Sequence, residues 1–172
     1  MQKVVRNVYL VGMTGVGKTT VGKILSNNLK WAFVDVNETI EAIYGRSQKE
    51  IFDSFGEDSF RKMEMTVLQE LSQGEHQVFA CNCDAVLDER KLLTMKRTGI
   101  TIWLDAPFQD ILERIGEMEK PGFPGRDTSQ TIQQMVKSRE GYYKQADVHV
   151  ATHESPPELT AQKILQLLRQ IE

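Results

Sequence analysis

One short stretch, GMTGVGKT at residues 12–19, constrains the fold of this chain more than any other feature. It matches the pattern G-x-x-x-x-G-K-[S/T], and it lies between an apolar strand-like run at 7–12 and a helical pattern at 18–29. Glycines let the backbone curl tightly so that N–H groups point at phosphate oxygens, and the following helix adds the positive end of its dipole. The stretch therefore predicts a loop that binds ATP or ADP. The residues expected to contact the nucleotide are Gly12, Gly15, Val16, Gly17, Lys18, Thr19 and Thr20.

The loop also supplies groups for chemistry on the phosphates. Lys18 is placed to reach the β- and γ-phosphates, and the Thr19 hydroxyl can ligate Mg²⁺. A carboxylate should help to hold the ion, and in α/β sheets ligands bind at the C-terminal ends of the strands. Asp35 and Asp105 both follow apolar runs and match this position equally well by spacing. Either can instead serve only as a cap for the next turn, so the local sequence leaves the choice open.

Short apolar runs alternate with longer helical patterns along the chain. Several runs are continuously apolar, as expected for strands covered on both faces, and the alternation implies a parallel sheet with right-handed crossovers. We therefore expect a single α/β domain over 1–172, with a five-stranded parallel sheet in a three-layer α/β/α arrangement. The expected strands are 7–12, 31–36, 77–82, 100–105 and 147–152, and the expected helices are 18–29, 57–73, 88–97, 107–118, 129–145 and 157–171.

Composition narrows the classes of partner. The net charge is −3 and no apolar run approaches the ~20 residues of a membrane span, so neither nucleic acid nor a membrane is an expected partner. The first residues run directly into a strand and do not resemble a signal peptide, which predicts the cytoplasm, or an organelle stroma if a targeting segment has been removed. Two cysteines indicate a reducing compartment with free thiols. We expect a monomer that binds small molecules.

The chain resembles the shikimate kinase family over nearly its whole length. Matching stretches include YLVGMTGVGKTTVGKIL, FVDVNETIEAIYGRSQKEIF, FGEDSFRKMEMTVLQEL, GITIWLDAPFQDILERI and SREGYYKQADVHV. The phosphate loop alone indicates only the superclass, whereas GRSxxEIFxxxGExxFRxxE is far more specific. The resemblance implies a P-loop kinase fold with a substrate-binding helical region at about 37–64 and a lid at about 117–130. It also implies transfer of a phosphoryl group from ATP, with Mg²⁺, to the 3-hydroxyl of shikimate.

The resemblance assigns roles to individual residues. Asp35 matches an Asp that assists Mg²⁺, which favours it over Asp105. The other matches are Lys18 and Thr19 for ATP and Mg²⁺, Arg61 and Arg139 for the shikimate carboxylate, with Glu64 and Tyr143 in the same motifs, and Arg114 for packing on adenine.

Two arginines that converge on one pocket suit an anionic substrate, because a planar guanidinium binds a carboxylate through two parallel N–H bonds. An alternative pairs Arg61 with Glu64 at i,i+3 as an ordinary helix-surface ion pair worth ~0.2–0.5 kcal/mol. Without the resemblance that alternative is favoured, and with it the substrate-binding interpretation is favoured.

Two residues expected to act on the reacting groups differ from the family pattern. Asn37 stands where the family has an Asp that contacts the shikimate hydroxyls. An amide cannot act as a base, and because base catalysis contributes ~10²–10⁴-fold, this change predicts a slower enzyme rather than an inactive one. Lys120 replaces a lid arginine at the γ-phosphate, which keeps the charge of that catalytic group but not its bidentate fork. Arg126 is a second cation nearby, and both residues can equally be solvated loop charges.

The stretch ACNCDAV at 80–86 departs further from the pattern. Asn82, Cys83 and Asp84 stand in the register of three family glycines that line the shikimate pocket, and their side chains should take up space close to the substrate. Asp84 also brings negative charge to a pocket expected to bind a carboxylate. Two like charges ~4 Å apart cost about 4 kcal/mol at an effective dielectric of ~20, unless Asp84 turns away or pairs with an arginine.

The two cysteines suggest other chemistry that we weigh against a structural role. A zinc site from Cys81, Cys83 and His149 is one alternative, although zinc normally needs three or four protein ligands. A disulfide between residues i and i+2 would be strained. We favour buried or half-buried thiols that fill space.

Two functions follow from these observations. The first is ATP-dependent phosphoryl transfer to a hydroxyl of a small polyhydroxylated carboxylate, with shikimate as the expected substrate. The alternative is a diverged protein that binds ATP or ADP without phosphorylating shikimate, with a regulatory role or a changed substrate. The intact nucleotide residues and arginines favour the first, whereas the substitutions at 37, 120 and 82–84 favour the second.

Overall fold

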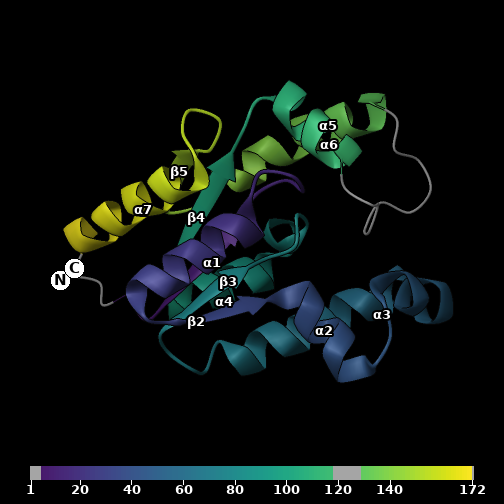
Figure 1. Cartoon of the computed structure of the whole chain (residues 1–172). Helices are drawn as coiled ribbons and strands as arrows, with labels where there is room; N and C mark the ends of the chain where they lie inside the picture. The colour runs from purple at the N-terminus through teal and green to yellow at the C-terminus, as the bar shows by residue number, and fades with distance from the viewer. Residues whose placement is uncertain (1–4, 118–128, 172) are drawn as a thin grey trace.

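A parallel sheet of five strands forms the centre of the molecule (Figure 1). The computed structural model describes residues 5–117 and 129–171. The strands lie in the order β2-β3-β1-β4-β5, and the predicted fold class is confirmed. The interior strands β1 and β4, whose sequences are mostly apolar, are buried along almost their whole length. The strands are β1 (Asn7–Val11), β2 (Ala32–Asp35), β3 (Gln77–Ala80), β4 (Ile100–Asp105) and β5 (Val148–Ala151).

The strand order places helices on both faces of the sheet. The connection from β1 to β2 runs towards one edge through α1 (Lys18–Leu29), whereas the connections from β3 to β4 and from β4 to β5 run towards the other edge. Because parallel crossovers are right-handed, these two directions put their helices on opposite faces. The last helix, α7 (Pro157–Ile171), packs beside α1. The remaining connecting helices are α4 (Glu89–Thr98), α5 (Phe108–Glu117) and α6 (Ser129–Tyr143).

The connection between β2 and β3 corrects the sequence prediction. A single helix at 57–73 was expected there beside a less defined helical region, but the chain forms α2 (Val36–Tyr44) and a long α3 (Gln48–Leu71). Local capping explains both starts. The Asp35 side chain accepts a hydrogen bond from the backbone N–H of Glu38 at 3.1 Å. Ser47 and Glu50 form a reciprocal capping box at the start of α3.

Gly56 divides α3 into two helical parts across a kink. Its φ of 81° and ψ of 169° are not helical, and a Cβ built at this position would meet nothing within 4 Å. The glycine is therefore required by the backbone angle, which side-chain-bearing residues rarely adopt, and not by lack of space. The first part of the helix carries Gln48 and Phe52, and the second carries Phe60 and Arg61.

The other boundaries agree with the predictions to within two residues, which is the usual uncertainty of helix and strand ends. Of the predicted lid at 117–130, residue 117 belongs to α5 and residues 129–130 belong to α6, and the remainder lies outside the described residues. Lys120 and Arg126 lie outside the described residues. Within the described part of the chain, no helix is both long enough and apolar enough to cross a bilayer.

Candidate active site

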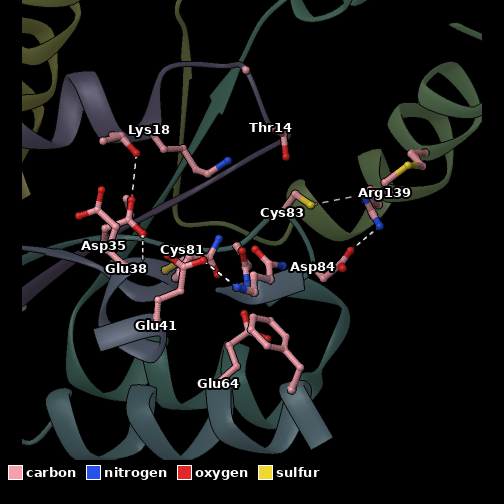
Figure 2. A pocket seen from close by; sticks show the side chains of 18 of the residues that line it. Thr14, Lys18, Asp35, Glu38, Glu41, Glu64, Cys81, Cys83, Asp84 and Arg139 are labelled. Atoms are coloured by element: carbon pink, nitrogen blue, oxygen red, sulfur yellow. Dashed lines mark hydrogen bonds and ion pairs between the residues drawn. The ribbon is translucent and has the colours of Figure 1, made fainter. Parts of the chain in front are cut away.

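A pocket of about 920 Å³ opens at the C-terminal edge of the sheet. It extends from the loop after β1 to helices α2 and α3, and the segment after β3 and helix α6 also contribute to it (Figure 2). Ligands in open parallel sheets bind at this edge, where neighbouring strands send their connections to opposite faces. The side chains of the predicted nucleotide site and of the predicted substrate site therefore share one cavity.

The loop after β1 has a backbone that only glycine allows. Gly12 has φ 144°, and a Cβ built there would lie 2.4 Å from the Leu104 carbonyl oxygen on the neighbouring strand β4. Gly15 and Gly17 have φ of 87° and 98°. Because these angles favour glycine and the first position also lacks space, the backbone can form the tight phosphate loop that the sequence predicts.

Lys18 bends back over this loop. Its Nζ donates to the carbonyl oxygens of Gly12 at 2.7 Å and Met13 at 2.9 Å. Burial lowers the pKa of the Lys18 amine. Arg114, the predicted adenine residue, donates from Nη1 to the carbonyl oxygen of Gly15 at 3.0 Å, so it lies directly beside the loop. Of the predicted nucleotide residues, Val16 is buried beneath the loop and Thr20 is exposed on α1.

The structure places Asp35, and not Asp105, against the predicted magnesium residue. The Thr19 hydroxyl donates to Asp35 Oδ2 at 3.1 Å, at the start of α1. Asp105 instead lies 3.1 Å from His149 Nε2 at the end of β4. A hydroxyl and a carboxylate are the oxygen ligands that Mg²⁺ prefers, so the pair Thr19 and Asp35 suits that ion. Nucleotide phosphates and water would supply its other ligands.

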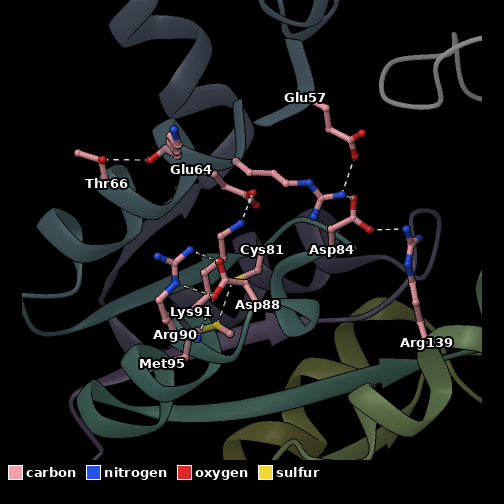
Figure 3. Close-up of polar contacts among 12 residues, drawn as sticks. Glu57, Glu64, Thr66, Cys81, Asp84, Asp88, Arg90, Lys91, Met95 and Arg139 are labelled. Atoms are coloured by element: carbon pink, nitrogen blue, oxygen red, sulfur yellow. Dashed lines mark hydrogen bonds and ion pairs between the residues drawn. The ribbon is translucent and has the colours of Figure 1, made fainter. Parts of the chain in front are cut away.

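Arg61 and Arg139 approach the pocket from two different helices. Arg61 lies on α3 and Arg139 on α6, and the carboxylate of Asp84 lies within ion-pair distance of both. Figure 3 shows Asp84 beside Arg139. Asp84 Oδ1 forms a close ion pair with Arg139 Nη2, and its Oδ2 lies 3.7 Å from Arg61 Nη2. The structure thus places the two predicted arginines at the same carboxylate. Asp84 avoids charge repulsion by pairing with arginines and not by turning away from the pocket.

The alternative ion pair between Arg61 and Glu64 is wrong. Arg61 pairs with Glu57 at 2.6 Å, which raises the pKa of the guanidinium. Glu64 forms a close ion pair with Lys91 of α4, and both side chains are almost completely buried, with 4% and 1% exposure. Buried charges need such a partner, because an isolated ion in the interior costs several kcal/mol. The Glu64–Lys91 pair therefore adds no net charge to the part of the site that holds the arginines.

Of the residues that depart from the family pattern, Asn37, Asn82, Cys83 and Asp84 line the pocket. The buried Oδ1 of Asn37 has no hydrogen-bond partner among the described residues. Tyr143 donates from its hydroxyl to the Cys83 carbonyl oxygen at 2.6 Å, which ties α6 to the segment after β3. Burial raises the pKa of Tyr143 and that of the Cys83 thiol.

The cysteines occupy different surroundings. Cys81 is buried, and its sulfur lies 3.8 Å from the sulfur of Met95. Cys83 is partly buried, and its sulfur lies 3.6 Å from Arg139 Nη1. His149, the third residue of the zinc alternative, stacks on Trp103 with ring centroids 4.1 Å apart. No group of three or more His, Cys, Asp or Glu side chains that could hold a metal occurs within residues 5–117 and 129–171.

Sequence reasoning missed the apolar wall of the site and four charged residues, Glu38, Glu41, Glu57 and Lys91. Glu57 precedes Arg61 by four residues, a spacing that predicts a helical ion pair once the helix is known. Lys91 gave no signal, because its partner Glu64 lies 27 residues away in the sequence. The wall is formed by Phe52 and Phe60, whose rings stack with centroids 4.9 Å apart.

The parallel sheet, the phosphate loop and a deep acceptor pocket beside it define the class of P-loop kinases that act on small molecules. The family model described as shikimate kinase matches residues 14–169. A shikimate kinase from Synechococcus elongatus is 36% identical over 164 residues, which cover 94% of this chain and 86% of that protein. The chain belongs to the shikimate kinase family.

Solved structures agree with this assignment. The shikimate kinase from Acinetobacter baumannii, in complex with shikimate, superposes with a TM-score of 0.90 and 32% identity, covering 97% of this chain and 94% of that one. The shikimate kinase from Aquifex aeolicus gives a TM-score of 0.85 and 34% identity, covering 95% and 96% of the two chains. The likeness extends over almost the whole chain and therefore includes the acceptor pocket as well as the phosphate loop.

Proposed function

We propose that this protein transfers the γ-phosphoryl group of ATP to a hydroxyl of shikimate, with Mg²⁺ as the metal. The observation that carries the proposal is a single pocket that joins a complete phosphate loop to a pair of arginines on facing helices. Phosphoryl transfer needs a cradle for the nucleotide and an acceptor held in line with it. Family membership supports shikimate as the acceptor, because the matched relatives carry that activity in their names.

The nucleotide end of the pocket supplies positioning and charge. Backbone N–H groups of the loop would hold the phosphates, and the amine of Lys18 would leave its carbonyl partners for the transferred phosphoryl group. Thr19 and Asp35 would hold Mg²⁺, which when bound neutralises charge on the phosphates. Arg114 lies on the outer side of the loop, where an adenine ring can stack on its guanidinium. Lys120 remains a prediction for the lid.

The acceptor end would orient the substrate through its carboxylate and its hydroxyls. Arg61 and Arg139 suit the carboxylate, because two guanidinium groups fix both its position and its plane. The buried Oδ1 of Asn37 can accept a hydrogen bond from a substrate hydroxyl. An amide does not take up the hydroxyl proton, so the chain would depend on positioning and charge and turn over more slowly than an enzyme with a carboxylate there.

The proposal is tested by measuring ADP release in a coupled assay with shikimate and with a panel of related hydroxy acids and sugars. We expect shikimate-dependent ADP release, and a loss of about 10³-fold in Lys18→Met, because a preorganised charge at the transferred group contributes on this scale. Lys23→Met is the matched control. It removes an exposed lysine of the same helix, which lies 5.7 Å from the Phe33 ring, and should leave the rate unchanged.

The alternative of a nucleotide-binding protein without kinase activity is not favoured by the family match, which covers both ends of the pocket. Tight ADP binding without turnover of any acceptor in the panel would nevertheless contradict the proposed function. Turnover of another hydroxy acid, with none of shikimate, would keep the reaction and change the acceptor.

A further inference from the structure

The carboxylate of Asp84 occupies the position between the two arginines that a substrate carboxylate would need. It forms ion pairs with Arg139 through one oxygen and with Arg61 through the other, at 3.7 Å for the second pair (Figure 3). The Arg139 side chain is only 11% exposed, so its pairing is largely shielded from water. A carboxylate that bridges two guanidinium groups in this way presents the same chemical group as the acid function of the substrate.

The charges around the two arginines also indicate that Asp84 takes the place of a substrate carboxylate. Arg61 faces Glu57 and Asp84, Arg139 faces Asp84, and the buried pair below them, Glu64 and Lys91, is neutral by itself. Two positive charges are thus matched by two negative charges before any substrate enters. An incoming carboxylate would meet a neutral cluster in place of a doubly positive one, and this removes most of the electrostatic attraction that two arginines provide.

The local structure aims Asp84 at this position and gives its side chain no other role. Asp84 precedes a short 3₁₀ helix, η1 (Ala85–Leu87), but its side chain makes no capping hydrogen bond there. Its backbone carbonyl accepts from the N–H of Leu87 at 3.0 Å, which fixes the turn. The preceding residue is held by Tyr143, which donates to the Cys83 carbonyl oxygen. The backbone is therefore fixed on both sides, while the carboxylate can rotate about its own side-chain bonds.

We propose that Asp84 is an internal competitor of the substrate carboxylate, and this inference rests on the proposed function. Asp84 holds Arg61 and Arg139, and a carboxylate substrate binds only when Asp84 rotates away from at least one of them. A neutral polyhydroxylated acceptor does not need this exchange. Asp84 therefore weakens binding of the acid. It also reduces the difference in affinity between acids and neutral analogues, because a group of the site itself opposes the acid.

The test compares Asp84→Asn and Asp84→Gly with the wild type. The first variant keeps the shape and removes the charge, and the second restores an open pocket without strain at φ −91° and ψ −2°. The Kd of shikimate is measured by calorimetry and its KM by coupled ADP release. We expect both constants to fall at least tenfold, while kcat changes less than threefold, because the competitor acts on binding in the ground state and the transition state alike.

Glu140→Gln is the matched control, since it also removes one negative charge, next to Arg139 on α6, but pairs with exposed Lys144 and does not line this pocket. It should change the Kd of shikimate less than twofold. The methyl ester of shikimate, which is neutral, provides a second control. Its Kd should be the same in the wild type and in Asp84→Asn, so that only the acid gains from the substitution. ADP affinity and the unfolding midpoint of each variant establish that it is folded.

Each result either supports or overturns the inference. An unchanged or higher Kd of shikimate in both folded variants overturns it, and so does an equal gain for the methyl ester or for Glu140→Gln. If the wild type turns over shikimate and the variants show no gain in affinity, the inference fails and the proposed function stands. If no variant turns over shikimate and Asp84→Asn still binds it at least tenfold more tightly, the proposed function fails and the competition stands. Absence of shikimate binding in all three proteins contradicts both.

Discussion

The two ends of the pocket are formed by different parts of the chain, with main-chain groups at the nucleotide end and charged side chains at the acceptor end. At the nucleotide end, glycine backbone angles shape the loop and Lys18 donates to main-chain carbonyl oxygens. At the acceptor end, side-chain charges from three separate segments hold one another, with Asp84 between Arg61 and Arg139. A site made of backbone changes only with the fold, whereas a site made of side chains changes with single substitutions. This difference is consistent with a complete phosphate loop beside an acceptor pocket for which the sequence predicts departures from the family pattern.

The largest expected effect tests the side-chain end, at the buried pair below the arginines. Lys91→Met leaves the Glu64 carboxylate buried without its partner, and we expect the free energy of unfolding to fall by about 3–5 kcal/mol. Glu64→Gln combined with Lys91→Met should recover most of this loss, since both charges are then absent. Urea denaturation measures each value. Lys144→Met, which breaks an exposed pair with Glu140, should cause no measurable change and is the control.

If Lys91→Met and Lys144→Met had equal effects, the acceptor end would not depend on its buried charges. The contrast between a nucleotide end formed by backbone and an acceptor end formed by charged side chains would then be unsupported at the acceptor end.

A smaller effect tests the backbone end. Gly12→Ala places a methyl group 2.4 Å from the Leu104 carbonyl oxygen at φ 144°, and we expect a loss of about 2–4 kcal/mol in unfolding free energy together with weaker ADP binding. Gly45→Ala is the matched control, because its φ of 62° is also left-handed but nothing lies within 4 Å of the new methyl group. It should cost about 1 kcal/mol and leave ADP binding unchanged.

Equal losses in the two glycine variants would show that the loop needs only a permissive angle at Gly12. A greater loss in Gly12→Ala would show that the backbone angle at this position and the approach of β4 together shape the nucleotide end.

The smallest expected effect concerns Cys81, which lies between the two ends. Burial raises the pKa of its thiol to about 12, from an ordinary value of 9.0. The unfolded chain therefore loses this proton first, so the stabilising contribution is complete below pH 9 and is lost as the pH rises towards 12. By the linkage relation, about 1 kcal/mol of unfolding free energy should disappear between pH 8 and pH 10. In Cys81→Ala the free energy of unfolding should fall less steeply as the pH rises, as measured by urea denaturation under reducing conditions. Equal slopes in the wild type and in the variant would contradict a raised pKa of the Cys81 thiol.

The fold was largely predictable because its determinants are local. Continuous apolar runs predicted the buried strands, and the phosphate loop fixed the order of β1 and α1. The boundary of α3 was missed, although Ser47 and Glu50 form a capping box that is visible in the sequence. The helical pattern before Gly56 is too short and too charged to be recognised without its cap.

The site was less predictable than the fold, because its partners lie far apart along the chain. The resemblance identified both arginines, and the charge argument foresaw that Asp84 had to turn away or pair with one of them. Pairing with both, across helices α3 and α6, depends on three-dimensional placement. The pair between Glu64 and Lys91 likewise joins two helices that no local pattern connects.

The kink at Gly56 has a consequence for how such a pocket diverges. The two parts of α3 contribute neighbouring portions of the acceptor wall, with Gln48 and Phe52 before the kink and Phe60 and Arg61 after it. One backbone angle, at a residue with open space around it, sets the angle between these portions. A lineage could therefore widen or narrow the cavity through substitutions at this joint while every wall residue stays the same. Residue-by-residue comparison of pocket linings would overlook that route to a new substrate.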